Sequence, residues 1–311
     1  MTVWAVFMDV HRLELLRELA ERGSITAVAH ATNRTVSAVS QQLKVLEREA
    51  GLPLTERSGR GIMLTGAGRM LAQTATDVAI ALERADAVWK EFTLSPRGEV
   101  TLTTFPTGGQ MLLPGLLDAV AEIPDLVLIA SDKDPLHPDF ADLTPDFDIV
   151  IADSPGLMPS WRERGLAVVK LMDEPLDVAL PEGHPLAAKA SLSAKDLVDV
   201  TWIGVPLGFP YDRILRQLEA ITGVPATIGQ RFLDNGIVEA LVATGHGVAI
   251  LPRFTTRDHE NGLITRPLSG MRSTRQISAL MRPDRAERPS VRLVVQALRD
   301  VARGVAAQHQ A

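Results

Sequence analysis

Residues of the types used in catalysis are present, but their spacing fits no common catalytic or metal site. The seven histidines include no HExxH pair or other close metal-ligand spacing. GxSxG, Walker A and GxGxxG segments are absent, and Gly108-Gly109 alone is too weak a signal for a phosphate loop. We therefore expect no catalytic residues, no metal and no cofactor.

Other residues of these types fit structural roles. The aspartates between residues 132 and 153 lack the ligand spacing of a calcium loop and indicate a solvated acidic surface. His184 lies in a Gly-His-Pro sequence, where a structural turn is expected. The chain has no cysteine, which excludes disulfides, thiol nucleophiles and Cys-ligated metals.

Composition and charge limit the classes of protein to which the chain can belong. Its 311 residues, 46% of them hydrophobic, indicate two or three folded units. No apolar run reaches the roughly 18–20 residues of a membrane helix, and the first residues make a poor signal peptide. A cytoplasmic protein without a membrane partner is therefore expected. The net charge is −6, yet residues 1–70 carry 9 Lys or Arg against 7 Asp or Glu. A mildly basic start on an acidic body is compatible with DNA binding.

The first sixty residues predict three short helices. Apolar residues at helical spacing end at Gly23, which is a plausible helix stop. Ser24 can cap a short second helix. After a polar break, Thr35 can cap a third helix, which Gly51 closes.

The third predicted helix has two different faces. Val39, Leu43, Leu46 and Ala50 share one face, which we expect to be buried. The opposite face has small groups near the helix start and a basic group further along, as a helix in the major groove requires. Together with the preceding turn, it supplies these candidate DNA contacts: Arg34, Thr35, Val36, Ser37, Ser40, Gln41 and Lys44.

A hairpin pattern follows the third helix, with strands at 54–57 and 62–64 joined by a turn at 58–61. Arg57 and Arg60 would then lie beside the phosphate backbone, as the wing of a winged helix does. The alternative is a small helical subdomain with a solvated polar face. The ordered run of helix, short helix, polar turn, capped helix and basic wing favours binding to double-stranded DNA.

Residues 65–92 predict one long helix, with Thr65 as its cap. Its apolar residues are spaced alternately four and three apart, which is an unbroken heptad seam. Such a seam indicates pairing with a second copy of the helix, and packing against the preceding helices is the alternative. The seam consists of Leu71, Ala75, Val78, Leu82, Ala85, Trp89 and Phe92.

Several short motifs match one family in order and spacing. They are Ala27-Val28-Ala29, Ser37-Ala38-Val39-Ser40-Gln41-Gln42-Leu43, Leu46-Glu47, Gly51-Leu52-Pro53-Leu54, Glu56-Arg57 and Leu64-Thr65-Gly66-Ala67-Gly68. Together they closely resemble the N-terminal signature of LysR-type transcriptional regulators. In that family the long helix pairs two subunits, so the resemblance implies a dimer.

The sequence departs from the family pattern at a few positions. Residues 1–7 precede the usual family start, which leaves Met1 and Met8 as alternative initiators. Arg34 stands where the family usually has an apolar residue, and Val36 where it often has Gln or Pro. Val36 cannot hydrogen-bond a base, although it can touch a thymine methyl group. The base preference of relatives is therefore not carried over.

Residues 98–311 alternate predicted strands and helices, which indicates a parallel sheet with crossover helices. Pro106-Thr107-Gly108-Gly109 is expected to form a turn. The expected strands lie near 99–105, 126–130, 148–152, 177–180, 201–203, 227–232, 248–251 and 276–281. The expected helices lie near 110–121, 212–222, 236–244 and 290–306.

Pro106-Thr107-Gly108 with Leu113-Pro114, Gly183 to Leu186, and Gly247 to Pro252 carry a less specific likeness. They resemble the effector domain of the same family, which is built like a periplasmic binding protein. The implied fold is multidomain, with an all-α winged helix-turn-helix, a linker helix and a bilobal α/β effector domain. The predicted boundaries are 1–65 for the DNA-binding domain, 66–93 for the linker helix, 98–172 with 269–311 for effector subdomain I, and 173–268 for subdomain II.

Ligands of such folds bind in the cleft at the carboxyl ends of the strands. Thr107 opens a helix, where free N–H groups favour an anion and Gly108 permits close approach. The alternative is that Thr107 only caps its helix. The family often uses this position to hold an effector carboxylate. Acidic groups at Asp153 and Asp234 suit an amine, although exposed helix caps are the commoner explanation for such residues. The other candidate cleft residues are Asp153, Ser154, Gly208, Phe209, Asp234 and Asn235.

The resemblance implies a sequence-specific transcriptional regulator, controlled by a small-molecule effector between the two subdomains. Its expected partners are double-stranded DNA, the effector, RNA polymerase and further copies of the chain in a homodimer or homotetramer. A bilobed α/β enzyme is the rival class, because fold alone does not fix function. A second alternative is a constitutive DNA-binding or architectural protein whose C-terminal half only oligomerises.

Overall fold

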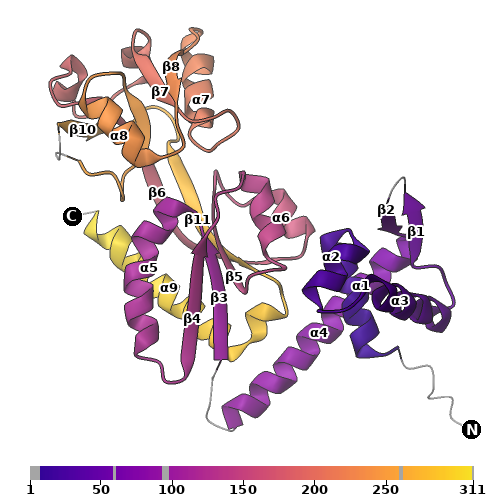
Figure 1. Cartoon of the computed structure of the whole chain (residues 1–311). Helices are drawn as coiled ribbons and strands as arrows, with labels where there is room; N and C mark the ends of the chain where they lie inside the picture. Colours follow the sequence, from indigo (N-terminus) through magenta and orange to yellow (C-terminus); the bar gives the residue numbers. More distant parts are fainter. Residues whose placement is uncertain (1–7, 59–60, 93–97, 259–261, 310–311) are drawn as a thin grey trace, which may run out of the picture.

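The computed structural model describes residues 8–58, 61–92, 98–258 and 262–309. Figure 1 shows a small N-terminal head, one long helix and two α/β lobes, of which the first lies beside the head. Within the described ranges, no helix is both long and apolar enough to cross a membrane. The multidomain fold predicted from the sequence is confirmed.

Three helices and a hairpin form the head: α1 (Val10–Arg22), α2 (Ile25–Ala31), α3 (Val36–Ala50), β1 (Thr55–Ser58) and β2 (Gly61–Leu64). Ser24 and Thr35 cap α2 and α3 as predicted, because each side-chain oxygen accepts a backbone N–H three residues on. Gly23 and Gly51 end α1 and α3 with φ of 65° and 69°, a left-handed conformation that suits glycine. The apolar faces of the three helices meet in one core.

Helix α4 (Gly66–Phe92) is the predicted long helix. Thr65 Oγ1 accepts a hydrogen bond from the Gly68 N–H at 3.0 Å, so Thr65 is its cap as expected. The first turns of α4 pack on α1, and Ala72 and Ala75 belong to the head core. Farther along, α4 contacts the short helix η4 (Arg285–Glu287) and α9 (Pro289–Gln308) of the first lobe. The helix therefore joins the head to that lobe.

Lobe I is built on strands in the order β6-β11-β5-β3-β4. Its further elements are β3 (Gly98–Thr104), α5 (Pro106–Ala121), β4 (Leu126–Asp132), η1 (His137–Leu143), β5 (Ile149–Ser154), α6 (Pro159–Glu163), the first half of β6 (Ala167–Pro181) and β11 (Thr274–Met281). Strand β3 runs parallel to β4 and β5, but β11 runs antiparallel to β5 and β6. The expected parallel arrangement holds for β3, β4 and β5 but not for β11, the late strand expected at 276–281. That strand returns from the other lobe and lies antiparallel in the middle of the sheet.

Lobe II continues from the second half of β6, which pairs with β9 and β10. Its elements are η2 (Pro185–Ala188), η3 (Ala194–Leu197), β7 (Thr201–Gly204), α7 (Asp212–Thr222), β8 (Thr227–Arg231), α8 (Asn235–Ala243), β9 (Ala249–Pro252) and β10 (Leu263–Arg266). Strands β7 and β8 form a parallel pair. One strand, β6, thus contributes to both lobes.

Two local expectations have clear outcomes. The turn expected at 106–109 is wrong, because α5 already begins at Pro106. Proline suits the first position of a helix, where its fixed φ fits and its missing N–H would have no helical partner. The structural role expected for His184 is confirmed, because its Nδ1 accepts a hydrogen bond from the Leu186 N–H at 3.2 Å.

Candidate DNA-binding and effector sites

Helix α3 is held in the head by one face and exposed on the other. Val39, Leu43 and Leu46 are buried in the head core, as predicted. Of the predicted contacts on the other face, Ser40 is half-buried. The exposed ones are Arg34, Thr35, Val36, Ser37, Gln41 and Lys44. The structure therefore brings these residues together on one accessible surface.

The backbone at the start of α3, as well as its side chains, is suited to face DNA. Thr35 Oγ1 accepts from the Ala38 N–H at 3.2 Å and lies 3.1 Å from Ser37 Oγ. Asn33, just before it, has a left-handed φ of 51°, which turns the chain sharply between α2 and α3. The positive end of the α3 dipole thus lies beside the predicted DNA contacts, where it favours a phosphate.

The wing is attached to α3 by one carboxylate. Glu47 Oε1 accepts hydrogen bonds from the Leu54 N–H, the Thr55 N–H and the Thr55 hydroxyl, each at 2.9 Å. These bonds fix the start of β1 against α3. Arg57 is exposed on β1, opposite Ile62 of β2, and Arg60 lies outside the described residues.

The heptad seam of α4 divides into two parts. Leu71 packs against the head core of its own chain, and Ala75 is buried within it, so these two do not face outward as the seam predicted. The alternative of packing within one chain holds for this part. Val78 is half-buried, whereas Leu82 is 50% exposed. Ala85 and Trp89 are also exposed. The side chain of Phe92 is not among those that the structure describes.

The candidate effector cleft lies between the lobes, as a cavity of about 360 Å³. The start of α5, the end of β5, the loop before α7 and the start of α8 all border it. The structure places five of the predicted residues on its wall: Thr107, Asp153, Phe209, Asp234 and Asn235. The structure does not place Gly108, Ser154 or Gly208 there.

Each of these three residues has a different surrounding. A Cβ on Gly108 would lie 2.7 Å from Phe105 Cζ, so this glycine permits helix–strand packing rather than approach to a ligand. Ser154 Oγ donates to the Gly156 carbonyl at 2.7 Å. Gly208 has a φ of 87°, a turn conformation that favours glycine.

A buried arginine that sequence reasoning missed forms the floor of the cleft. Arg275 of β11 is 3% exposed, and its Nε donates to Glu174 Oε2 at 2.8 Å. Its Nη1 donates to Asp153 Oδ2 at 3.3 Å, and its Nη2 donates to Thr107 Oγ1 at 2.8 Å. The guanidinium also lies 4.8 Å from the centre of the Phe105 ring. Thr107 is therefore a partner of Arg275 inside the first turn of α5, and Phe105 occupies the cap position.

Negative charge predominates around this arginine. Desolvation in the cleft, together with the charge of Asp153, raises the pKa of Asp134 to about 6. Burial alone would raise the pKa of Asp153, but the nearby His137 and Arg275 outweigh burial and hold that pKa below its ordinary value. Burial raises the pKa of Tyr211 to about 12, so its hydroxyl stays a hydrogen-bond donor.

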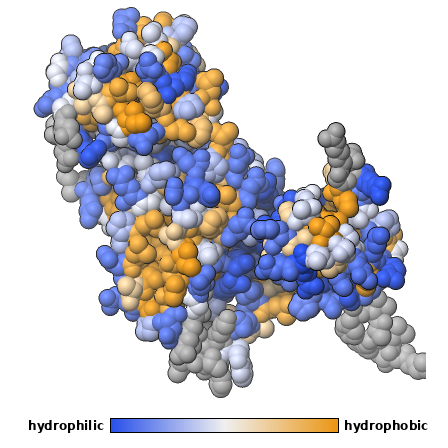
Figure 2. Space-filling view, in the orientation of Figure 1, coloured by the Kyte–Doolittle hydropathy of each residue, from blue (hydrophilic) through white to orange (hydrophobic). Residues whose placement is uncertain are grey.

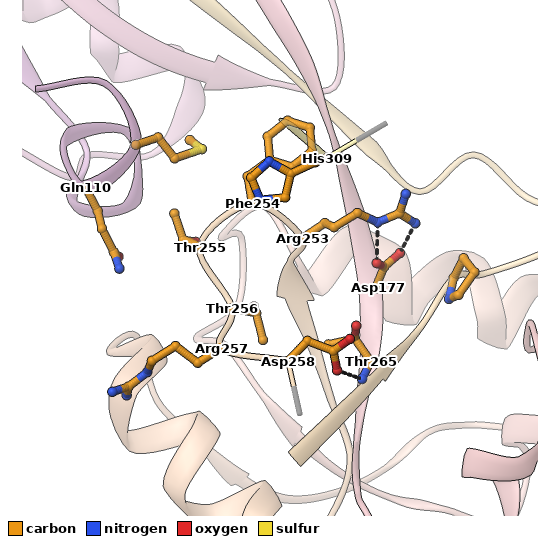
Figure 3. Close-up of a pocket in the computed structure, with 12 residues that line it drawn as sticks. Gln110, Asp177, Arg253, Phe254, Thr255, Thr256, Arg257, Asp258, Thr265 and His309 are labelled. Carbon is orange, nitrogen blue, oxygen red and sulfur yellow. Dashed lines mark hydrogen bonds and ion pairs between the residues drawn. The ribbon is translucent and has the colours of Figure 1, made fainter. Parts of the chain in front are cut away.

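A second cavity, of about 710 Å³, borders β6, β9 and β10 (Figure 3). Arg253 on its wall binds both carboxylate oxygens of Asp177 at 2.6 and 2.8 Å. The rings of Phe254 and His309 lie 4.5 Å apart and bring the end of α9 against the loop after β9. Because these groups are engaged with each other, the cleft beside Arg275 is the better candidate for an effector.

Comparison with known proteins identifies the class. The model of the LysR substrate binding domain matches residues 94–303. The model described as "Bacterial regulatory helix-turn-helix protein, lysR family" matches residues 10–69. A probable nitrogen assimilation transcriptional activator of Synechococcus elongatus is 26% identical over 294 residues, with 92% of each chain covered.

Solved structures share the fold. Full-length OxyR C199D from Pseudomonas aeruginosa superimposes with a TM-score of 0.63 at 22% identity, covering 94% of this chain and 98% of OxyR. Full-length CbnR complexed with its target DNA gives a TM-score of 0.53 at 21% identity, covering 95% and 100%.

A winged helix-turn-helix head joined by a long helix to two α/β lobes defines a DNA-binding transcriptional regulator with an effector domain. The chain belongs to the LysR family of transcriptional regulators. Regulators of this family bind DNA and a small-molecule effector, oligomerise and are not enzymes, so the rival enzyme class is set aside.

Proposed function

We propose that the exposed face of α3 enters the major groove and that the wing follows the phosphate backbone. The observation that carries this proposal is the exposure of small and polar side chains at the start of α3, whose other face is fixed in the core. Small groups can approach base edges, and Lys44, two turns beyond Ser37, can reach a phosphate. The proposed DNA contacts are Arg34, Thr35, Val36, Ser37, Ser40, Gln41, Lys44, Arg57 and Arg60.

Replacing Lys44 by Ala is expected to weaken binding to all DNA sequences alike. Because one phosphate contact is lost, the slope of log affinity against log salt should fall by about 1. Replacing Ser37 by Ala is the matched control, expected to keep that slope and to alter the preferred sequence. Fluorescence anisotropy on a selected and a scrambled site, over a salt series, measures both. A wild-type slope in Lys44→Ala would contradict the phosphate contact.

The predicted domain boundaries also remain our proposal: 1–65, 66–93, 98–172 with 269–311, and 173–268. The apolar cores of the two lobes are separate from each other, which supports the division of the effector domain. Met172 and Ile277 belong to the core of lobe I, whereas Leu176 and Leu268 belong to the core of lobe II. The chain passes between these cores twice, and both proposed boundaries lie near a passage.

For the cleft, the proposed effector carries a protonated amine. Of the described charged residues on the cleft wall, Arg275 is positively charged and the others are aspartates. The N–H groups of Arg275 already bind Glu174, Asp153 and Thr107. Asp134 and Asp234 line the same wall, and Asp234 Oδ1 also caps α8 by accepting a hydrogen bond from the Ile237 N–H at 2.9 Å. An ammonium group would therefore balance the charge, whereas a simple carboxylate would add to a negative excess.

Asp134 provides a pH test of this proposal. Its pKa is about 6, and a neighbouring ammonium would lower it, so amine binding releases a proton. Affinity for an amine should therefore fall as pH drops below about 6, by up to roughly tenfold per unit. Replacing Asp134 by Asn should remove this pH dependence, and replacing the exposed Asp139 by Asn should keep it. Calorimetric titration with the strongest amine from a thermal-shift panel measures the effect.

The same panel separates the alternatives, because it contains diamines, amino acids, aromatic acids and sugar acids. A ligand at 100 times its dissociation constant adds about 2.7 kcal/mol to the free energy of unfolding. Stabilisation only by acids that lack an amine would contradict the amine proposal. Stabilisation by no compound would favour the constitutive regulator instead.

Two apolar surfaces support a proposed homodimer or homotetramer. On α4, Leu82 continues the heptad seam beyond the head. On lobe I, Leu117, Val127 and Ile129 are exposed along α5 and the edge strand β4, where Figure 2 shows an apolar area. Exposed apolar edges of this kind commonly bind another chain. The α4 surface alone suits a dimer, and both surfaces together suit a tetramer.

A further inference from the structure

The head and lobe I meet through charged side chains rather than through a shared apolar core. Among the described residues, the head core contains no residue of lobe I, and the lobe I core contains none of the head. Across the junction, Arg17 Nη1 lies 2.8 Å from Asp284 Oδ2. Arg282 Nη1 lies 2.8 Å from Glu18 Oε1. The partners are 267 and 264 residues apart in the sequence, so this contact is a feature of the tertiary fold.

These charges are removed from water yet remain ionised. Arg17 and Glu18 are 7% and 8% exposed, and Arg282 and Asp284 are 3% and 5% exposed. Although burial disfavours their charges, the arginines hold the pKa of Glu18 and of Asp284 below the ordinary values. The junction is therefore built from paired charges whose geometry must be met closely.

The edge of the junction adds a more accessible pair. Arg22 of α1 lies 2.7 Å from Glu18 and 2.8 Å from Asp146 Oδ1 of lobe I. Its Nη2 also donates to the Pro145 carbonyl at 3.1 Å. The Asp146 side chain is 58% exposed, so this pair can be altered without disturbing a core.

Such a junction is suited to open and close. Buried ion pairs are specific in geometry but contribute little net free energy after desolvation. Packing is also incomplete, because a cavity of about 530 Å³ lies between the head and lobe I. In the described part of the chain, Arg17 Nε and Arg282 Nη2 have no hydrogen-bond partner. The contact can therefore separate at modest cost and re-form in one register.

Strand β11 connects this junction to the effector cleft. Arg275 lies in β11 at the cleft, and Arg282 follows the last residue of the same strand. The seven residue steps from Arg275 to Arg282 span roughly 23 Å of extended chain. Because β11 is held between β5 and β6, a displacement of Arg275 is passed along a rigid element.

We propose that the junction is an ionic latch that sets the orientation of the head. When closed, the latch fixes the head on lobe I. Given the recognition helix and the oligomer proposed above, on which this step rests, the closed latch thereby fixes the separation of two recognition helices. When open, the head turns with α4 relative to lobe I. The more accessible pairs Arg84–Glu287 and Arg288–Glu83 between α4 and lobe I then separate as well. A ligand that displaces Arg275 biases the latch through β11. The latch residues are Arg17, Glu18, Glu21 and Arg22 of α1 with Asp146, Arg282 and Asp284 of lobe I.

The absence of cysteine allows a direct distance measurement. Cysteines introduced at the exposed Glu14 of α1 and Asp118 of α5 carry spin labels, and labelled subunits are diluted into unlabelled ones. Pulsed electron paramagnetic resonance then gives the distribution of head-to-lobe distances. One narrow distance is expected for the otherwise unaltered protein. Asp284→Leu should at least double the width, because Arg17 loses its partner and Arg282 loses one of its partners. A distribution already as broad without this substitution would overturn the latch.

Further variants distinguish opening of the latch from misfolding of the protein. Arg17→Met with Asp284→Leu should restore the narrow distance, because the charges of that pair are both gone. Arg282 loses Asp284 but keeps Glu18 and Glu21 across the junction. Asp146→Lys changes an exposed residue, faces Arg22 with a like charge and should broaden the distribution. Asp300→Leu on α9 is the matched control and should match the unaltered protein. If neither Asp284→Leu nor Asp146→Lys broadens the distribution, the latch is refuted.

A DNA measurement tests the proposed control of half-site separation. Lengthening a selected operator by two base pairs between its half-sites should lower wild-type affinity at least tenfold. The same change should lower the affinity of Asp146→Lys less than threefold, because its heads are free to turn. Equal losses for the two proteins would show that the latch does not set the separation.

Discussion

Substituting Met for Arg275 is expected to lower the free energy of unfolding by about 3–5 kcal/mol. The substitution leaves Glu174 and Asp153, which are 0% and 2% exposed, without their shared cation. Buried carboxylates that lose a cation are strongly disfavoured, although Asp153 keeps His137 nearby, and the hydrogen bond to Thr107 at the start of α5 is lost as well. Urea unfolding followed by circular dichroism measures the change.

Two further variants test whether this loss of stability comes from the unpaired carboxylates. Arg257→Met removes a more exposed arginine, paired with Glu239, and should change stability by no more than about 0.5 kcal/mol. Arg275→Met combined with Glu174→Leu should regain part of the loss, because one carboxylate is no longer left unpaired. An Arg275→Met protein as stable as wild type would show that Arg275 is not the neutralising charge of the cleft.

Replacing Leu82 by Lys is expected to give a monomer and to lower operator affinity 10²–10⁴-fold. A lysine on the exposed part of the seam places like charges between paired α4 helices. Without pairing, the second half-site no longer binds at the high effective concentration that linkage provides. Sedimentation velocity measures the mass, and anisotropy on one and two half-sites measures the affinity.

Asp77→Lys is the matched control for this prediction, because Asp77 is exposed on a different side of α4. It introduces the same side chain and should keep both the oligomer and the affinity. A Leu82→Lys protein that keeps its mass would assign self-association to another surface, such as β4 and α5. Equal affinity of the wild-type protein for one and for two half-sites would contradict the proposal that a dimer binds both half-sites.

The head was predictable because short-range patterns specify it. The caps Ser24 and Thr35 and the glycines Gly23 and Gly51 act within one turn of their own helices, so a local sequence determines each boundary. The lobes depend on pairing between distant segments. Strand β6 was expected only at 177–180, because the charged and proline residues at 173–175 interrupt its apolar pattern.

The first half of β6 and the arginine in the cleft could not be predicted from the sequence for the same reason. Glu174 is tolerated inside β6 because Arg275, 101 residues later, neutralises it. Neither residue explains the other from local sequence, although a charge within an apolar strand is a signal to look for a partner. Thr107 and Asp153 could be assigned to the cleft wall because they follow the carboxyl ends of strands, and their binding of an effector stays a prediction.

The heptad seam shows a different limit. Spacing identifies which side of α4 is apolar, but not which partner covers it. Ala75 meets the head of its own chain, whereas Leu82 lies beyond the reach of that head. The division follows from where α1 ends against α4, which depends on tertiary packing.

Binding to DNA selected from genomic fragments tests the central claim most directly. The measurement compares the affinity for a selected site with that for a scrambled site, using wild-type protein and a Ser37→Ala/Gln41→Ala/Lys44→Ala variant. If α3 reads the operator, wild-type protein should prefer the selected site at least 10³-fold, and the variant should lose that preference while staying folded. Retention of the preference by the variant, or its absence in the wild type, would contradict the assignment of α3 as the recognition helix.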